Sequence, residues 1–322
     1  MDIATSYQKV DDALPMFLQN LTLRAFALGD FKAMAQSMVN DGALIYWLDG
    51  QTNTIKAPNE NLSRELMELF ILGVNRYSES DVRETAKALT GYRVNKTSGA
   101  VTFLPKQHFN GTINFLGTSG PYDGDSLCEY LVSRSDCALF ISERLWYRFI
   151  SSTTTFADQG LTQSFAQRDI SKLVQTLGRH PALDDPANSM VKSPIDWFVS
   201  VCRALQITPS MFSNTALIRR YLDNLGQVPF FPPNVGGWPA DQAWLSSSSA
   251  QYRIQFATAL VKEANLSPIS SLSEATRIAG LADLLGVAAW SQRTELALRG
   301  AIKDPQRLVL LAICSPEYVV SA

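Results

Sequence analysis

Apolar side chains recur at helical spacing along most of the chain, and few segments alternate as a strand does. Between residues 11 and 49 the repeat predicts two or three helices. Several later helices begin at a serine or asparagine N-cap, one of them with a capping box of Ser78 and Asp81, and two end at glycine, at Gly73 and Gly91. These signals predict a mainly α-helical fold. The later helices are predicted at residues 60–72, 78–90, 125–133, 136–151, 159–166, 169–178, 194–205, 249–264, 272–286, 292–302 and 304–314.

Two stretches interrupt the helical pattern. Residues 92–94 and 101–104 flank the turn-rich segment 95–99, which predicts one short β-hairpin. Residues 226–244 hold four prolines, three glycines and two tryptophans and are expected to form an irregular loop. Because no internal repeat is present and the helices follow at short intervals, we expect one helical domain over residues 1–322.

The predicted helix 60–72 carries acidic residues in an unusual place. On a helical wheel, Glu65 falls inside the apolar arc formed by leucines and Phe70, while Asn61 and Glu68 lie along its edge. A carboxylate on a core face must be paired, hydrogen-bonded or protonated. Glu65 is therefore either a general acid, base or metal-binding carboxylate, or half of a structural ion pair.

The predicted helix 136–151 is apolar almost all round, so we expect it to run through the core. Arg144 and Arg148 lie four residues apart on it. An arginine in such a position is expected to have a carboxylate partner or to reach a pocket. The sequence thus suggests that Glu65 or Glu68 pairs with Arg144 across facing helices.

The chain has only two histidines. His108 follows the hairpin and, with Asn110 and Asp123 or Asp125, either belongs to a polar site or fixes a loop. His180, at a predicted helix end, is expected to complement the helix C-terminus.

The loop 229–239 combines prolines and glycines with aromatic side chains. Such a loop either walls a binding cleft or forms a rigid crossing whose aromatics fill the core. We take Asn234 and Trp238 in this loop, together with Asn61, as candidate binding residues.

Composition excludes several classes of site. Four cysteines, no two closer than nine residues, and two histidines leave no zinc ribbon, no His-Glu-x-x-His helix and no thioredoxin-type pair, so no metal-ligand motif is predicted. The balance of 28 basic and 30 acidic residues gives no electrostatic case for nucleic-acid binding. No window has the roughly 18 apolar residues of a membrane span, and the first residues lack a signal-peptide pattern. From these residues we expect either a cytoplasmic protein or a missing start.

The motifs, taken in order, make the chain resemble a bacterial family catalogued as domain of unknown function 1800. The resemblance rests on segments spread over nearly the whole sequence. They are 58–73, 77–82, 88–92, 108–117, 144–146, 191–194, 226–227, 232–238 and 315–318.

This resemblance implies a setting more than a reaction. The family usually carries a further N-terminal helical segment with a Trp-His-x-His-Phe stretch just before an Ala-Thr-Ser like residues 4–6, so the chain is similar to an N-terminally truncated member. Members are often exported and often encoded beside a protein that resembles the sulfatase and alkaline phosphatase class. The resemblance thus implies an exported or envelope-associated two-protein system. Because the sequence shows no catalytic signature and carries the polar and aromatic loop 229–239, we expect a non-catalytic binding or assembly component of such a system.

The alternative is a hydrolase-like enzyme. One form of this hypothesis makes the enzyme metal-dependent. The sequence leaves any cofactor unknown. Its site would gather Asn61, Glu65, Glu68, Arg144 and His108 around a cleft. In the metal-dependent version, the histidines of the missing N-terminal stretch would help to hold the ion.

Overall fold

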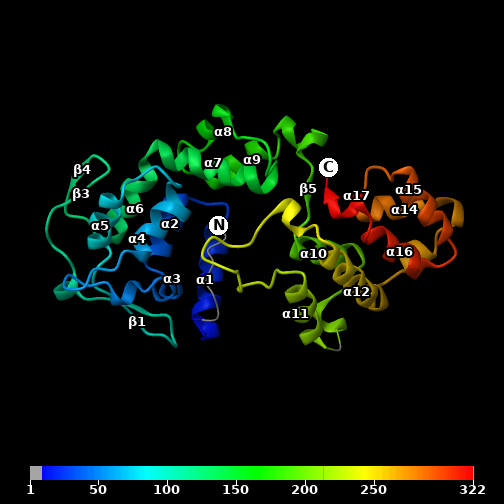
Figure 1. Ribbon diagram of the computed structural model, residues 1–322, viewed down its shortest axis with the longest axis horizontal. Coiled ribbons are helices and arrows are strands. Elements are labelled where there is room, and N and C mark those ends of the chain that lie inside the picture. The colour runs from blue at the N-terminus through cyan, green and yellow to red at the C-terminus, as the bar shows by residue number, and fades with distance from the viewer. Residues whose placement is uncertain (1–8, 213, 322) are drawn as a thin grey trace. The chain divides into compact units, whose positions relative to one another are not determined.

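The computed structural model describes residues 9–212 and 214–321 (Figure 1). Most of these residues lie in α-helices, joined by a few two-stranded antiparallel sheets, so the predicted fold class is confirmed. The chain divides into two compact units. Unit 1 comprises Met1–Phe149, Thr154–Pro181 and Phe230–Gly237, and unit 2 comprises Ile150–Thr153, Ala182–Pro229 and Trp238–Ala322. Whether they act as one domain, as we expect, stays a prediction.

Unit 1 is built from helices and two hairpins. Its helices are α1 (Ala13–Phe26), α2 (Phe31–Val39), α3 (Gly42–Trp47), α4 (Asn61–Glu65), α5 (Glu79–Ala88), α6 (Gly124–Ser133), α7 (Ser135–Phe149), α8 (Gln159–Ser164) and α9 (Ile170–Leu177). Its strands are β1 (Tyr92–Val94), β2 (Val101–Phe103), β3 (Ile113–Phe115) and β4 (Thr118–Gly120). The hairpin of β1 and β2 is the predicted one, with Arg93 opposite Thr102.

Local side-chain caps decide where many of these helices begin. The predicted capping box of α5 is confirmed, because Ser78 and Asp81 each accept a hydrogen bond from the other's backbone N–H. A side-chain cap of this kind contributes about 1 kcal/mol. The other helix starts of unit 1 with a side-chain cap use aspartates: Asp30, Asp41, Asp123, Asp158 and Asp169.

The core of unit 1 forms where α2 packs on α6 and α4 packs on α5. The buried hydroxyls of Ser63 and Thr85 are hydrogen-bonded at 2.6 Å and join α4 to α5. The predicted stop at Gly73 is also confirmed, because its φ is +90° and an added Cβ would lie 2.7 Å from the Phe140 ring. Large core side chains of this unit include Phe31, Leu44, Ile45, Leu62, Met67, Ile71, Leu72, Leu89 and Phe165.

Helix α7 departs from the sequence expectation. Its buried residues, Cys137, Ala138, Ile141 and Ser142, lie in its first half, whereas Phe149 at its end is exposed. The prediction that this helix runs through the core was wrong. The buried residues are spaced one, three and four positions apart, so α6, α8 and α9 cover one face of the helix, and exposed apolar side chains on the other face are common at protein surfaces.

Unit 2 is a helical assembly with one short sheet. Its elements are β5 (Met190–Val191), α10 (Pro194–Ala204), α11 (Thr215–Asn224), α12 (Ser247–Glu263), α13 (Ser267–Ser270), α14 (Glu274–Leu285), α15 (Gln292–Gly300), α16 (Pro305–Ile313), α17 (Pro316–Val319) and β6 (Val320–Ser321). The prediction from sequence missed α11, although Leu217, Ile218, Tyr221 and Leu222 recur at helical spacing on it. It also missed the pairs β3–β4 and β5–β6, whose strands of two or three residues are too short to show alternation.

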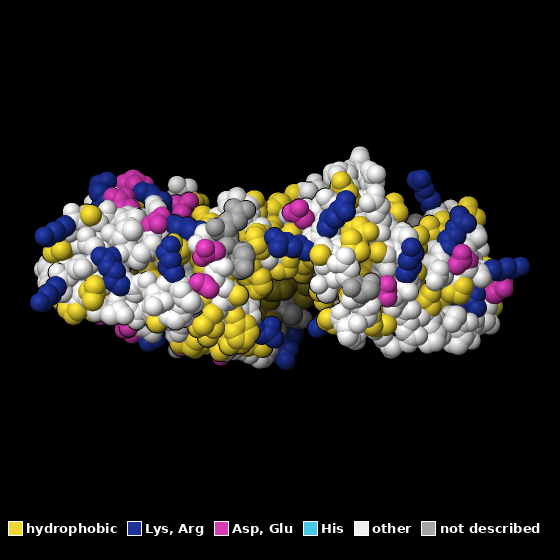
Figure 2. All heavy atoms as spheres, turned by 90° about the horizontal axis from the view of Figure 1, so that it is seen from below, with side chains coloured by type: hydrophobic (Ala, Val, Ile, Leu, Met, Phe, Trp, Pro, Cys, Tyr) yellow, Lys and Arg dark blue, Asp and Glu magenta, His cyan; other side chains and the backbone are white. Residues whose placement is uncertain are grey.

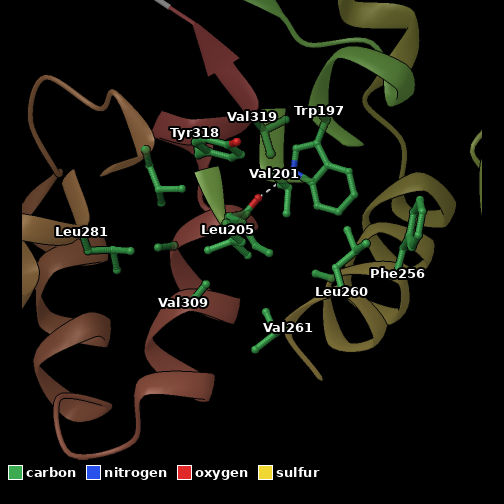
Figure 3. Close-up of a cluster of buried hydrophobic side chains, with 14 of the residues drawn as sticks. Trp197, Val201, Leu205, Phe256, Leu260, Val261, Leu281, Val309, Tyr318 and Val319 are labelled. Carbon is green, nitrogen blue, oxygen red and sulfur yellow. Dashed lines mark hydrogen bonds between the residues drawn. The ribbon is translucent and has the colours of Figure 1, made fainter. Parts of the chain in front are cut away.

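An aromatic cluster stands at the centre of unit 2 (Figure 3). Trp197 of α10 is fully buried, and its indole N–H donates to the carbonyl oxygen of Ile313 at the end of α16, with 2.7 Å between the two atoms. Phe256 of α12 stacks on Tyr221 with ring centroids 4.7 Å apart. These contacts join α10, α11, α12 and α16 into one core.

Candidate functional site

The segment that holds the predicted acidic residues is helical but not regular. Asn59 lies two residues before the first residue of α4, and its side-chain oxygen accepts the N–H of Asn61 at 3.0 Å. After α4 the chain winds into a π-helix over Leu66–Ile71, and the N–H of Leu72 donates to the carbonyl of Met67. π-Helical turns are rare and occur often at functional sites.

The π-helix changes which side chains face the core. Met67 and Ile71 are fully buried, whereas Leu69 is only half-buried. The arc drawn at 100° per residue, which included Leu69, was therefore wrong in this part, because a π-helix turns less per residue than an α-helix.

Glu65 and Glu68 lie together on this segment, both half-buried. The Tyr77 hydroxyl donates to an oxygen of Glu68 in a short hydrogen bond. Burial, and secondarily the charge of Glu68, raises the pKa of the Glu65 carboxyl above its usual range. Burial likewise raises the pKa of the Tyr77 hydroxyl, and its hydrogen bond to Glu68 adds to this. The cluster is thus a carboxylate pair with a phenol, in which Glu65 holds a proton more readily than an exposed glutamate.

Arg64, the cationic residue next to Glu65 in sequence, forms its ion pair with another carboxylate. Both terminal nitrogens of Arg64 donate to the carboxylate of Glu79 at 2.7 Å. This bidentate hydrogen bond lowers the pKa of Glu79. Among the described residues, Glu65 has neither an ion-pair partner nor a side-chain hydrogen bond, so Arg64 offsets its burial only in part.

Arg144 does not join the acidic pair. It is exposed, and its guanidinium lies over the Tyr147 ring at 5.9 Å. The suggested ion pair of Arg144 with Glu65 or Glu68 is not formed. Instead Arg76, four residues after Leu72, forms two hydrogen bonds of 2.8 and 2.9 Å with Glu143, the residue before Arg144.

His108 is buried at the end of the hairpin region. Its Nδ1 lies 3.0 Å from the carbonyl oxygen of Thr90, to which it donates, and its ring meets the edge of Phe103. The N–H of Phe109 donates to the Thr90 hydroxyl at 2.8 Å. These contacts fasten the turn to the end of α5, which favours the loop-fixing interpretation.

His180 has a different partner from the one expected. Its Nε2 lies 2.9 Å from a carboxylate oxygen of Asp158, and its ring packs edge-on against Trp146. The histidine thus pairs with the residue that caps α8.

The three candidate binding residues are all at least partly accessible. Asn61 is exposed at the start of α4. Asn234 is exposed in a tight turn, in which its side-chain oxygen accepts the N–H of Gly236 at 2.8 Å. Trp238 packs at the edge of the unit 2 core, and its buried indole N–H has no hydrogen-bond partner in the described residues. Asn61 and Asn234 of unit 1 are thus accessible to a ligand.

An apolar surface on α1 was not recognised from the sequence. Leu14, Phe17, Leu18 and Leu21 are between 42% and 59% exposed, whereas the buried residues of α1 are Pro15, Met16 and Gln19. Figure 2 shows hydrophobic side chains gathered on this face over α1. The apolar period predicted the helix correctly, but a period does not say whether a neighbour covers the face.

A groove lies beside this apolar surface. It encloses about 560 Å³ between α1 and the start of α3. Asp41 at its wall bonds to Gln19 and caps α3, and burial raises the pKa of the Asp41 carboxyl. The lining residues are Leu21, Thr22, Ala25, Phe26, Ser37, Asn40, Asp41, Gly42 and Gly99.

Two searches of the described part of the chain bear on the wider function. Within residues 9–212 and 214–321, no three His, Cys, Asp or Glu side chains gather as a metal-binding group. Over those same residues, no helix combines the length and the apolar character needed to span a membrane.

Comparison with known proteins agrees with the sequence motifs. No curated protein and no solved structure matches the chain. The model of the family described as "Protein of unknown function (DUF1800)" matches residues 2–320. Because this match covers nearly the whole sequence, the chain belongs to the DUF1800 family.

Proposed function

We propose that the protein is a non-catalytic binding or assembly component that binds a partner protein through α1. The observation that carries this proposal is the exposed apolar surface of α1, formed by Leu14, Phe17, Leu18 and Leu21. Single exposed apolar residues are common, whereas a contiguous apolar patch marks an interaction surface.

Covering the α1 surface supplies part of the free energy of association. Fully burying one leucine or phenylalanine contributes about 1.5–3 kcal/mol. Covering the exposed half of four such side chains therefore contributes on the order of 4 kcal/mol. The groove next to them offers Thr22, Ser37 and Asn40 as polar groups that can orient a bound segment.

The family setting suggests which partner this is. We propose the neighbouring protein that resembles the sulfatase and alkaline phosphatase class, in an exported or envelope-associated pair. A helix presenting alternate apolar anchors fits a hydrophobic groove on such a partner.

Co-purification tests the proposal. The chain is co-expressed with the sulfatase-like neighbour, and Phe17→Asp is compared with Leu296→Asp, a change at an isolated side chain that is 72% exposed on unit 2. We expect Phe17→Asp to reduce recovery of the partner at least about tenfold and Leu296→Asp to leave it unchanged. Equal recovery with both variants would contradict the proposal, and self-association that only Phe17→Asp abolishes would identify a second copy as the partner.

A second candidate function, hydrolysis, is favoured by Glu65, Glu68 and Tyr77. A carboxyl with a raised pKa beside a hydrogen-bonded carboxylate is the arrangement that general acid–base catalysis uses. In a metal-dependent version the two glutamates would supply oxygen ligands. The test is turnover of chromogenic phosphate and ester substrates by wild type and by Glu65→Gln, with elemental analysis of both proteins. A wild-type rate in Glu65→Gln and no bound metal would remove this candidate.

A further inference from the structure

Arg253 of α12 is the charged residue whose surroundings are hardest to explain. It is only 4% exposed and lies on the buried face of the helix, between Ser249 and Phe256. Its guanidinium lies over the ring of Trp197 at 5.9 Å. The charge is thus held inside the aromatic core of unit 2, whose Trp197 and Phe256 are drawn in Figure 3.

Two of its nitrogens, Nε and Nη2, are buried and have no hydrogen-bond partner in the described residues. The neighbouring charge that acts on it is that of Cys314, but burial raises the pKa of this thiol to about 12, so the thiol is neutral at physiological pH. Ser249 does not compensate, because its hydroxyl donates to the carbonyl oxygens of Trp244 and Ser246. Among residues 9–212 and 214–321, no anion therefore balances the guanidinium.

Two other partly buried arginines of the chain have hydrogen-bond acceptors for their guanidinium groups. Arg168 in unit 1 donates to five backbone carbonyl oxygens, and Arg277 in unit 2 donates to four. An arginine stays charged even when buried, and an uncompensated buried charge is strongly unfavourable. The fold satisfies this requirement at Arg168 and Arg277 and leaves it open at Arg253.

The open nitrogens have a geometry that selects a ligand. Nε–H and one N–H of Nη2 point the same way along one edge of the guanidinium and match two oxygens of a carboxylate or phosphate. We propose that Arg253 is the anchor of an oxyanion-binding site in unit 2 that takes a compact carboxylate or phosphate group. Trp197 supports the guanidinium plane from one face, and Cys314, which retains some exposure, places the site near the surface. This site goes beyond the proposed function, which rests on unit 1.

Calorimetric titration of the full chain tests the proposal, with inorganic phosphate and acetate as separate probes at constant ionic strength. We expect saturable binding of one ion per chain for at least one probe. Phosphate alone would assign a phosphoryl ligand, and acetate alone a carboxylate ligand. Arg253→Lys keeps the charge but loses the two-nitrogen edge, so binding should weaken at least about tenfold. Arg203→Lys, at an exposed arginine of α10, is the matched control and should bind as wild type does.

The following results would support or overturn the oxyanion site. No saturable binding of either ion to wild type overturns the proposal, and so does equal binding by Arg253→Lys and wild type. Phe17→Asp should retain ion binding, because its surface lies in unit 1, so failure of the partner proposal leaves this test intact. The bound ion should also raise the melting temperature of wild type by about 2–4 °C, and this shift should be absent in Arg253→Lys.

Discussion

The two units place their unusual residues in opposite ways. Unit 1 leaves apolar side chains outside, on α1, and satisfies its partly buried Arg168 with backbone carbonyls. Unit 2 gathers its aromatic side chains around Trp197 and leaves Arg253 inside without an anion. Our two proposals rest on this difference: association with a partner through α1 of unit 1, and oxyanion binding at Arg253 of unit 2.

The largest effect should come from the aromatic core of unit 2. Trp197→Ala removes a fully buried indole and its hydrogen bond to Ile313, and it should destabilise the protein by about 3–5 kcal/mol. Phe17→Ala on the α1 surface should change stability by less than about 0.5 kcal/mol. Urea unfolding followed by circular dichroism measures both. A similar loss for both variants would mean that the α1 surface is part of a core.

The two arginines provide the next comparison. Arg168→Met removes five hydrogen bonds to carbonyl oxygens, and it should cost about 2–4 kcal/mol. Arg253→Met, measured in a buffer without oxyanions, should be neutral or stabilising, because it replaces an unpaired buried charge. The melting temperatures of the two variants, compared with that of wild type, test this prediction. Strong destabilisation by Arg253→Met in that buffer would show that the protein itself balances this charge.

The smallest effect concerns the acidic pair of unit 1. Because the pKa of Glu65 is raised in the folded protein, its protonation favours the fold, and stability falls as pH rises from the ordinary glutamate range through the raised value. Glu65→Gln should therefore be more stable than wild type near neutral pH, by less than about 1 kcal/mol since the side chain is half-exposed. The difference should shrink as pH falls below the raised pKa. Unfolding midpoints measured over a pH series check this, and a constant difference at all pH values would refute it.

Local signals in the sequence predicted the helices well. The Ser78–Asp81 box and the stop at Gly73 depend on residues a few positions apart, so both were predictable and both are confirmed. The π-helix of Leu66–Ile71 packs against α6 and α7, which are distant in sequence, and no local pattern predicted it. For the same reason, the pairing of Arg76 with Glu143 and the exposure of α1 were not predicted.

The candidate sites were predictable only in part. Glu65 was predicted inside the apolar arc of its helix, and in the structure it is half-buried with a raised pKa. Whether it or the other predicted residues act in catalysis or binding stays a prediction. Arg253 was missed, although it falls at helical spacing with Ser249 and Phe256 on one stripe of α12. A charged residue within an apolar stripe was the signal, and it was followed at Glu65 but not at Arg253.

The pairing of β5 with β6 has a consequence for biosynthesis. Met190–Val191 is the first strand of unit 2, yet its partner strand is Val320–Ser321, so this contact joins residues far apart in sequence. Contacts of such long range form late and slow folding. On the ribosome, α10 through α16 are synthesised before Val320–Ser321, the strand that closes the sheet. Unit 2 is thus expected to complete this sheet only after Val320–Ser321 has been synthesised, whereas the two hairpins of unit 1 close over a few residues.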